Sequence, residues 1–472
     1  MNATAIRFTM AIWALGTAGC VHFVPKPLAA EQTSMILESR TLSDAGLREF
    51  MVRNLGHPLD LWPPSRWDQD LLTLAAFYYN PDLAAARAHW SVQQAGERTA
   101  GERPNPVLTV TPDYATNAPP GVSAWLPAAA LDVTIEIAGK RGHRIEQARR
   151  LSESARWNIW TTAWEVRFEV RTSLLDAADA QQREELLKEQ VTVQEHIDAL
   201  LEKRRLAGAV AGSDLVLFRT QLAKTRLDLQ AARAQRIDAQ ARVALAVGIP
   251  MSALNGVPIG FNFNQTEAAD LTSEEAHRHA VQGRSDLLSA LADYAAAQSA
   301  LQLEIARQYP DVHLGPGYQW DQGQNDWSLG LALELPVLNW HRGPIAEAEA
   351  RRGEAAARFT AFQANVINEV DAAVTAVQAE RQGSQAAEAL LAVHRDRLQA
   401  MQAQVDAGAG DALDLATAQF EFTAAEALAL EACGGEQRAL GVLERAVQRP
   451  LGAPDQAHAL QRQLESTQRS PQ

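Results

Sequence analysis

Apolar and polar residues follow two different periods along this chain. Over six stretches, apolar and small side chains recur every three or four positions, which is the period of a helix that buries one face. The predicted helices are 66–103, 143–206, 213–247, 272–307, 345–406 and 411–447, with candidate breaks at Asn80-Pro81 and Gly283. At ~1.5 Å per residue the longest helices reach roughly 95 Å. Such helices suit a tube wall or an extended coiled coil and not a compact domain.

Four short segments alternate by two instead, which places one set of side chains on each face of a strand. They are 106–114, 130–137, 311–320 and 327–335. Apolar residues on one face and polar residues on the other, with aromatics near an end, are typical of a membrane β-barrel. A half-buried sheet in a soluble protein alternates in the same way. Because even small closed barrels use about eight strands, these four would span a membrane only if several chains pooled them.

The whole pattern occurs twice, which indicates a tandem duplication. A shift of 204 residues aligns Asp82-Leu83 with Asp286-Leu287, and a shift of 200 aligns the Ala-Gly-Ala turns at 207–209 and 407–409. The predicted fold is mostly α with a small β part. The predicted divisions are 1–19, a lipoprotein signal peptide; 20–65, an N-terminal extension running outside the helices; 66–250, the first repeat; 251–271, a linker; 272–450, the second repeat; and 451–472, a polar tail.

The first twenty residues have the form of an export signal. Arg7 precedes an apolar run, and small residues lead to Cys20, which is predicted to become an acylated lipid anchor. An ordinary signal peptide with an incidental cysteine is the alternative. After residue 20 no apolar run approaches the ~20 residues of a membrane helix. The second cysteine, Cys433, lies among small residues and is interpreted as a buried side chain, so no disulfide framework is expected.

Charge and motifs exclude several classes of protein. With 43 basic and 57 acidic residues the formal charge is −14, which argues against a nucleic-acid binder with a basic face. The chain has no CxxC, no HExxH and no dense histidine cluster, so a high-affinity metal site is not expected. It also lacks a Gly-rich phosphate loop and a nucleophile elbow. The sequence therefore does not predict an enzyme.

The order of helix starts, strand exits and turns resembles the TolC-like outer-membrane efflux protein family over about residues 66–450. The motifs are the helix starts Asp82-Leu83 and Asp286-Leu287, the strand entries Pro106 and Pro310, the strand exits 136–142 and 334–343, and the turns followed by Asp214-Leu215 and Asp414-Leu415. The exits look most like those of the heavy-metal branch. The resemblance implies a homotrimer whose twelve pooled strands form an outer-membrane barrel and whose helices form a periplasmic tunnel. It also implies a Gram-negative outer-membrane location, a periplasmic adaptor and an inner-membrane pump of the resistance-nodulation-division type as partners, no cofactor and no catalysis.

Carried over to this chain, the resemblance predicts two sets of channel residues. The periplasmic tip would contain Gly208, Asp214, Asp406, Gly408, Asp411 and Asp414. The lumen of the barrel would contain Asp132, Thr134, Glu136, Asp311, His313 and Glu334. Rings of carboxylates favour cations. A structural interpretation stays open, in which Ser213 and Asp411 cap helices, the Asp-Leu aspartates suit the helix dipole, and the strand carboxylates are merely solvated.

Two functions remain open at this point. The first is a passive trimeric exit duct of an efflux pump, which carries divalent metal cations or small toxic compounds. The alternative is a structural periplasmic coiled-coil lipoprotein without channel activity. Oligomeric state and extraction from the membrane separate the two.

Overall fold

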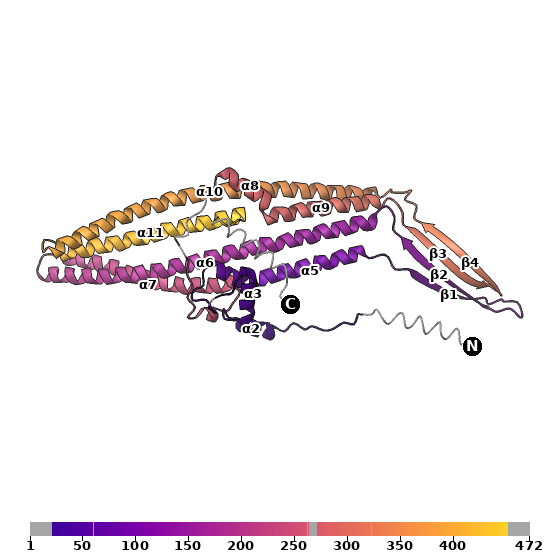
Figure 1. Cartoon of the computed structure of the whole chain (residues 1–472), viewed down its shortest axis with the longest axis horizontal. Coiled ribbons are helices and arrows are strands. Elements are labelled where there is room, and N and C mark those ends of the chain that lie inside the picture. The colour runs from indigo at the N-terminus through magenta and orange to yellow at the C-terminus, as the bar shows by residue number, and fades with distance from the viewer. Residues whose placement is uncertain (1–20, 60, 262, 264–270, 322, 452–472) are drawn as a thin grey trace.

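The computed structural model describes residues 21–59, 61–261, 263, 271–321 and 323–451 (Figure 1). The N-terminal extension contains α2 (Ala30–Glu38) and α3 (Ala45–Leu55). The first repeat contains α4 (Gln69–Tyr79), α5 (Pro81–Gly101), β1 (Val107–Tyr114), β2 (Trp125–Ile135), α6 (Lys140–Leu206) and α7 (Gly212–Val247). After η1 (Met251–Leu254), the second repeat contains α8 (Ser273–Gly283), α9 (Ser285–Ala306), β3 (Val312–Asp321), β4 (Gln324–Leu333), α10 (Arg342–Asp406) and α11 (Ala412–Val447). The expected signal peptide 1–19, Cys20 and residues 452–472 of the polar tail lie outside the described residues.

The predicted first helix of each repeat is broken in two at the same place. In the first repeat the break is at Asn80, whose side chain accepts hydrogen bonds from the backbone N–H groups of Asp82 and Leu83 while Pro81 begins α5. In the second repeat the break is at Arg284, between α8 and α9. Both break residues donate to matching carbonyls, Asn80 to Ala246 O at 3.2 Å and Arg284 to Ala446 O at 2.8 Å. Each break therefore docks against the end of the last helix of its own repeat.

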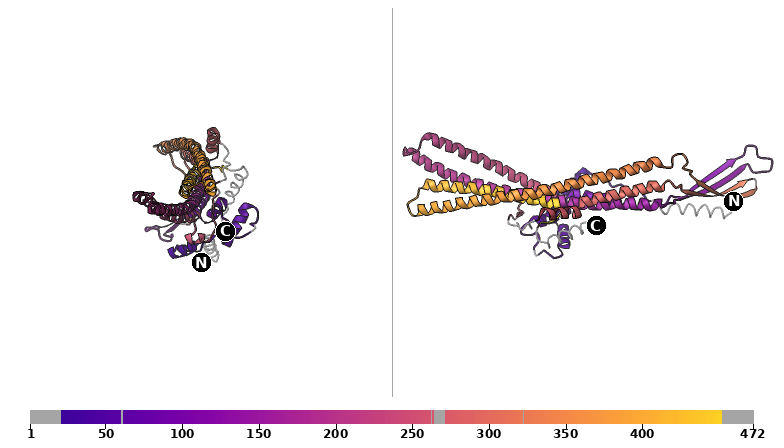
Figure 2. Two further views of the ribbon diagram at one scale, coloured as in Figure 1. Left: turned by 90° about the vertical axis from the view of Figure 1, so that its left-hand side faces the viewer. Right: turned by 90° about the horizontal axis from the view of Figure 1, so that it is seen from above.

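The long helices lie side by side in a single curved layer (Figures 1 and 2). In the half toward the sheet the order of packing is α5, α6, α9 and α10. In the other half it is α7, α6, α11 and α10, so α6 and α10 run the full length and the shorter helices stack beside them. Because each inner helix contacts a neighbour on both sides, it carries more than one apolar stripe.

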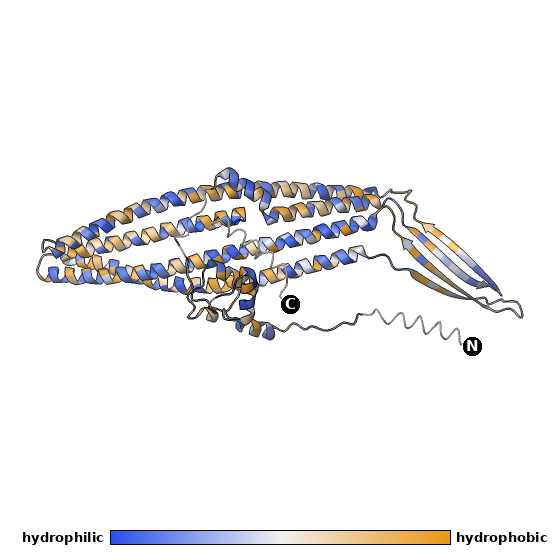
Figure 3. Cartoon of the chain, in the orientation of Figure 1, coloured by the Kyte–Doolittle hydropathy of each residue, from blue (hydrophilic) through white to orange (hydrophobic). Residues whose placement is uncertain are grey.

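The sheet stands at one end of the helical layer, in the antiparallel order β1-β2-β3-β4. The register pairs Leu108 with Leu131, Val133 with Leu314, and Leu314 with Leu331. All four strands therefore place their apolar positions on one shared face, as the alternation predicts, and Figure 3 shows the alternation along the strands. Of the described strands, β1 and β4 are paired on one side only.

The ends of the strands differ from those expected from the sequence. β2 begins at Trp125 and not at 130, because the segment from Trp125 continues the ladder to Tyr114 of β1. At the other end, β2 stops at Ile135 and β4 at Leu333. Glu136 and Glu334, expected to occupy strand positions, therefore lie just beyond the strands. The first of them leaves the ladder where it pairs with Arg144 of α6.

The main apolar core lies at the waist, where α4 meets α6, α7 and the N-terminal extension. Leu47 and Met51 of α3 are fully buried there, and the ring of Phe50 packs 5.4 Å from that of Tyr78. α3 therefore packs against α4, a contact that the sequence did not predict. Its buried face is apolar, and Asp44 caps its N-terminus by accepting from the backbone of Leu47.

Charged side chains join the waists of the two repeats. Arg167 of α6 contacts Glu444 of α11 at 2.9 Å and Asp70 of α4 at 3.1 Å. Burial alone would lower the pKa of Arg167, but these two carboxylates outweigh it and raise the pKa above its ordinary value. The guanidinium is therefore a permanent cation that links both repeats.

Candidate channel surfaces at the sheet, the strand exits and the helix tips

The apolar face of the sheet is open in the single chain. Trp327, Leu329 and Leu331 expose 80%, 75% and 63% of their surface, and Leu108 and Val110 are similarly exposed. Exposed apolar patches of this kind mark surfaces that contact another apolar phase. At the end of the sheet away from the helices lie two matching aromatic pairs with ring centroids 5.0 Å apart. They are Tyr114 with Trp125 and Tyr318 with Trp327.

The opposite face of the sheet carries a polar cluster that the sequence predicted only as separate positions. The Nδ1 atom of His313 lies 3.2 Å from both carboxylate oxygens of Asp132 and 3.3 Å from the hydroxyl of Thr134. These side chains come from the neighbouring strands β2 and β3. The cluster is half exposed, so it forms a solvated polar surface and not a closed site.

Two ion pairs fix the strand exits to the helices. Lys140, whose side chain is only 8% exposed, contacts Asp311 at 2.7 Å. Arg144 donates hydrogen bonds of 2.7 and 3.2 Å to the two carboxylate oxygens of Glu136. The hydrogen bonds and charge of Glu136 raise the pKa of Arg144. Glu334, the counterpart of Glu136, is exposed and has no ion-pair partner among the described residues. The two expected carboxylates therefore differ, since only Glu334 offers a free charge.

The tips of the two helical hairpins have the same backbone geometry. Gly208 and Gly408 adopt φ values of +76° and +71°, and the N–H groups of the turn reach back to carbonyls of the last helical turn. A left-handed residue just after a helix end favours glycine, which has no side chain to clash. The tips therefore bring the acidic residues after both turns to one end of the molecule (Figure 1).

The acidic residues of the tips have different surroundings. Asp411 caps α11 by accepting from the backbone of Leu413 at 2.8 Å and also pairs with Arg204 of the first repeat. These contacts, the backbone hydrogen bond first, lower its pKa. Asp406 accepts from Gln402 at 3.0 Å, whereas Asp214 and Asp414 are exposed in the first turns of α7 and α11.

The structural interpretation of the tips fails only at Ser213, since Asp214 and Asp414 lie in the first turns of their helices. Ser213 does not cap α7, because that helix begins at Gly212 after Ala211 and has no side-chain cap. Asp411 is a helix cap as expected, and its ion pair with Arg204 adds a link between the repeats that the sequence did not reveal. Near this link a small apolar cluster joins the two hairpins through Val193, Ile197 and Ala416.

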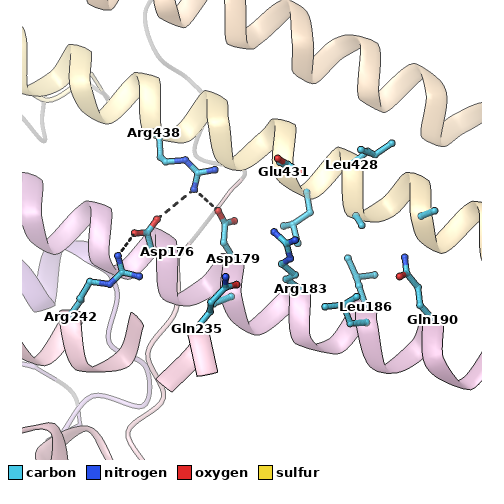
Figure 4. Close-up of a pocket in the computed structure, with 15 residues that line it drawn as sticks. Asp176, Asp179, Arg183, Leu186, Gln190, Gln235, Arg242, Leu428, Glu431 and Arg438 are labelled. Carbon is cyan, nitrogen blue, oxygen red and sulfur yellow. Dashed lines mark hydrogen bonds and ion pairs between the residues drawn. The ribbon is translucent and has the colours of Figure 1, made fainter. Parts of the chain in front are cut away.

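A groove of about 650 Å³ lies away from the tips, where α6 and α7 of the first repeat meet α11 of the second (Figure 4). At one end Arg438 contacts Asp176 at 3.5 Å and Asp179 at 2.8 Å, and Arg242 contacts Asp176 at 3.5 Å. Burial raises the pKa of Asp179, although Arg438 opposes the shift. The other end is lined by leucine and alanine side chains, among them Leu428. Sequence patterns could not reveal this groove, because its charges come from three distant segments.

Two features are absent from the described ranges. No helix there is long and apolar enough to cross a membrane. No group of three or more His, Cys, Asp or Glu side chains is arranged there to hold a metal ion. The half-buried Cys433 is a free thiol whose pKa is raised by burial.

Both repeats match one protein family. Residues 75–249 and 277–449 fit the family model described as outer membrane efflux protein. The chain belongs to this family. The resemblance to TolC-like efflux channels that the motifs indicate is thereby confirmed.

Individual relatives in this efflux family have low sequence identity to this chain. The cobalt-zinc-cadmium resistance protein CzcC of Cupriavidus metallidurans is 25% identical over 352 residues, which cover 72% of this chain and 77% of CzcC. The structure of CusC matches with a TM-score of 0.67 at 18% identity, over 80% of this chain and 91% of CusC. The outer-membrane channel OprN matches with a TM-score of 0.65 at 19% identity, over 91% of this chain and 98% of OprN. The mostly helical fold with a small antiparallel sheet is therefore that of known outer-membrane channels.

Proposed function

We propose that this chain is one subunit of a passive exit duct in a tripartite efflux system. Three copies pool their strands into a twelve-stranded barrel in the outer membrane of a Gram-negative cell, and their helices form the periplasmic tunnel. A periplasmic adaptor and an inner-membrane pump of the resistance-nodulation-division type deliver the substrate. Residues 1–19 direct export, and Cys20 carries the lipid anchor. The duct binds no cofactor and catalyses nothing.

One observation carries this proposal: the sheet is apolar on one face and polar on the other, and among the described residues nothing pairs with either edge. Backbone groups at a sheet edge cannot remain unpaired in hydrocarbon, because no water replaces the missing hydrogen bonds. With β1 and β4 at the edges, β4 of one copy can pair with β1 of the next. A ring of copies then removes every edge, with the apolar face toward lipid.

In this assembly the polar face of the sheet lines the lumen. Asp132, Thr134 and His313 form the wall, and Glu334 stands at the joint between barrel and tunnel with a free carboxylate. Glu136 and Asp311 contribute less charge, because Arg144 and Lys140 neutralise them. At the other end, Asp214 and Asp414 present carboxylates at the periplasmic entrance, where a ring of negative charge favours cations.

We propose divalent metal cations as the substrate class, with small toxic compounds as the second candidate. The relative CzcC is a cobalt-zinc-cadmium resistance protein, and the lumen residues are acidic without forming a closed metal site. A duct requires ligands weak enough to release the ion again. The half-exposed cluster of Asp132 and His313 has that character.

Two substitutions on one strand test the barrel. Leu331→Arg places a cation on the apolar face of β4, and Ser328→Arg places the same cation on the polar face. An Arg facing lipid near the membrane centre costs about 2–4 kcal/mol, so we expect Leu331→Arg to lose the trimer and its detergent-only extraction. The Ser328→Arg protein keeps the trimer and conducts cations less well in planar bilayers. Equal assembly of both variants would contradict the assignment of the faces.

The wild-type protein decides between the duct and the structural spacer. A duct is a trimer that only detergent extracts and that conducts ions. A monomer released by high salt would establish the spacer instead.

Loss of the gene tests the substrate class. A deletion strain is compared with its parent for growth in zinc, cobalt and cadmium salts, and beside these in dyes and antibiotics. Greater sensitivity to the metals, restored by the wild-type gene but not by the gene for the Leu331→Arg protein, is the expected result. Unchanged metal tolerance together with lost dye tolerance would replace metal cations by organic compounds as the cargo.

A further inference from the structure

The two strand exits have different lengths and different chemistry. The first exit, residues 136–142, turns into α6 at once, and its Lys140 is buried against Asp311. The second exit, residues 334–343, has additional residues before the matching arginine. It carries four apolar side chains that are exposed in the chain. They are Leu335 at 68%, Val337 at 64%, Leu338 at 95% and Trp340 at 52%.

The second exit is a formed turn. Trp340 and His341 adopt φ values of +51° and +54°, a region that non-glycine residues rarely occupy. The turn is held by Asn339, whose side chain accepts from the backbone of His341 at 3.0 Å, and by Glu304 of α9, which contacts Nε2 of His341 at 2.7 Å. A strained turn that presents apolar side chains to the outside indicates that these side chains contact something.

An arginine stands at the matching position of each exit. Arg141 donates its Nε to the carbonyl of Gly101 at 2.7 Å, and Arg342 begins α10. Neither guanidinium forms an ion pair with a carboxylate in the part of the chain that the structure describes. Phosphate is the anion that an unpaired guanidinium binds with two parallel hydrogen bonds.

We propose that the second exit is a membrane anchor, in which Leu338 and Trp340 insert at the boundary between headgroups and acyl chains of the periplasmic leaflet. Arg342 binds a phospholipid phosphate beside it, and Arg141 binds one at the first exit. The inference rests on the proposed outer-membrane barrel. Alternation carries the apolar face of β4 from Leu329 through Leu331 to Leu333, and the exposed side chains of the exit follow directly, so the exit continues the lipid-facing surface to its periplasmic border. Tryptophan with apolar neighbours and basic residues is the composition of such a border.

Lipid quenching of a fluorescent label tests the anchor on the full chain. The label is attached to Leu338→Cys in a Cys433→Ser background, and the protein is placed in nanodiscs with or without brominated acyl chains. Leu329→Cys on the apolar face of the sheet is the positive control. Leu428→Cys, exposed at 53% on α11, is the negative control. We expect a blue shift and a loss of intensity at positions 338 and 329, and no change at 428.

The outcomes separate the anchor from the barrel. Quenching at 329 without quenching at 338 overturns the anchor and leaves the barrel in place. Absence of quenching at both positions overturns the proposed function as well. A blue shift at 338 that is equal in detergent and in lipid, without quenching, assigns the surface to a second copy of the chain and also overturns the anchor.

The arginine contact has its own test. Arg342→Glu reverses the charge beside the turn, and Arg358→Glu makes the same change farther along α10, where the side chain is 78% exposed. We expect weaker quenching of the label at 338 in the Arg342→Glu protein and the wild-type level in the Arg358→Glu protein. Equal quenching in both proteins overturns the phosphate contact.

Discussion

The waist of each repeat, where α4 or α8 packs against the long helices, occupies an equivalent place in the two repeats. The two helices differ in polarity. In the first repeat, α4 is apolar on almost every side, and Leu72, Leu74 and Phe77 are fully buried. In the second repeat, α8 is amphipathic, begins with a capping box at Thr272, and buries only Ala276 and Ala280. The duplicated pattern therefore preserved the position of this helix while its surroundings diverged.

The difference follows from what covers each helix. Over α4 lie α3 of the N-terminal extension and the described part of the linker, where Trp67 and Ile259 form a parallel bridge. Over α8 the described residues place no such layer, so its outer face is charged. The extension thus converts one of two equivalent surface helices into a core helix, because a covered helix must be apolar on all sides.

A matched pair of truncations tests this comparison most strongly. Leu74 and Arg278 occupy the same position of α4 and α8, but Leu74 is buried and the Arg278 side chain is 56% exposed. Leu74→Ala leaves a cavity and is expected to lower the free energy of unfolding by about 2–5 kcal/mol. Arg278→Ala is expected to change it by less than about 0.5 kcal/mol. Urea unfolding in detergent, followed by circular dichroism, measures both, and similar losses would contradict the view that only α4 is core.

The break residues give the next largest effect. Arg284→Ala removes the donor to Ala446 O and the partner of Asp286 and Glu369, which contact it at 2.7 and 2.8 Å. We expect a loss of about 2 kcal/mol, since the carbonyl is left buried without a partner.

Asn80→Ala is the counterpart in the first repeat. It removes the cap of α5 and one buried hydrogen bond, and about 1 kcal/mol is expected. The same unfolding experiment compares the two variants. A larger loss for Asn80→Ala would reverse the view that the second waist depends more on charge.

A dependence on pH is the smallest expected effect, and it belongs to α8. Burial first, then Arg449 and Arg278, lower the pKa of His279 below 6.5, while Glu275 opposes them. The unfolded chain therefore binds this proton more tightly, so the stability present above about 6.5 is lost as the pH falls below it toward the lower folded pKa. We expect His279→Gln to flatten the melting temperature between pH 7 and pH 5, with the exposed His89→Gln on α5 as control. The matching residue of α4 is Ala75, so the first waist has no such group. An unchanged pH profile in His279→Gln would remove this difference.

Sequence reasoning found the features that depend on local periodicity. The helices, the two faces of the sheet and both glycine turns follow from repeats of 3.6 and 2 and from the left-handed turn that Gly208 and Gly408 adopt. These patterns can be recognised without knowing which segments lie next to them in the fold. The start of β2 at Trp125 was missed because Pro127 and a run of alanines interrupt the alternation.

The remaining features depend on contacts between distant segments. Arg167 with Glu444 and Arg204 with Asp411 join residues of different repeats, and no pattern within either segment indicates the partner. The burial of α3 was missed for the same reason, because the residues that α3 packs against lie on α4. The candidate lumen residues were found as positions, but the sequence could not show that Arg144 neutralises Glu136 and leaves Glu334 free.

The two unpaired sheet edges have a consequence for biogenesis. A row of open backbone groups on β1 and β4, beside an exposed apolar face, is a template for pairing with any extended chain. A copy without partners is therefore an aggregation hazard. In the proposed ring, assembly is a competition between ordered ring closure and disordered strand pairing. The backbone groups that would complete the ring are the same ones that endanger the unassembled chain.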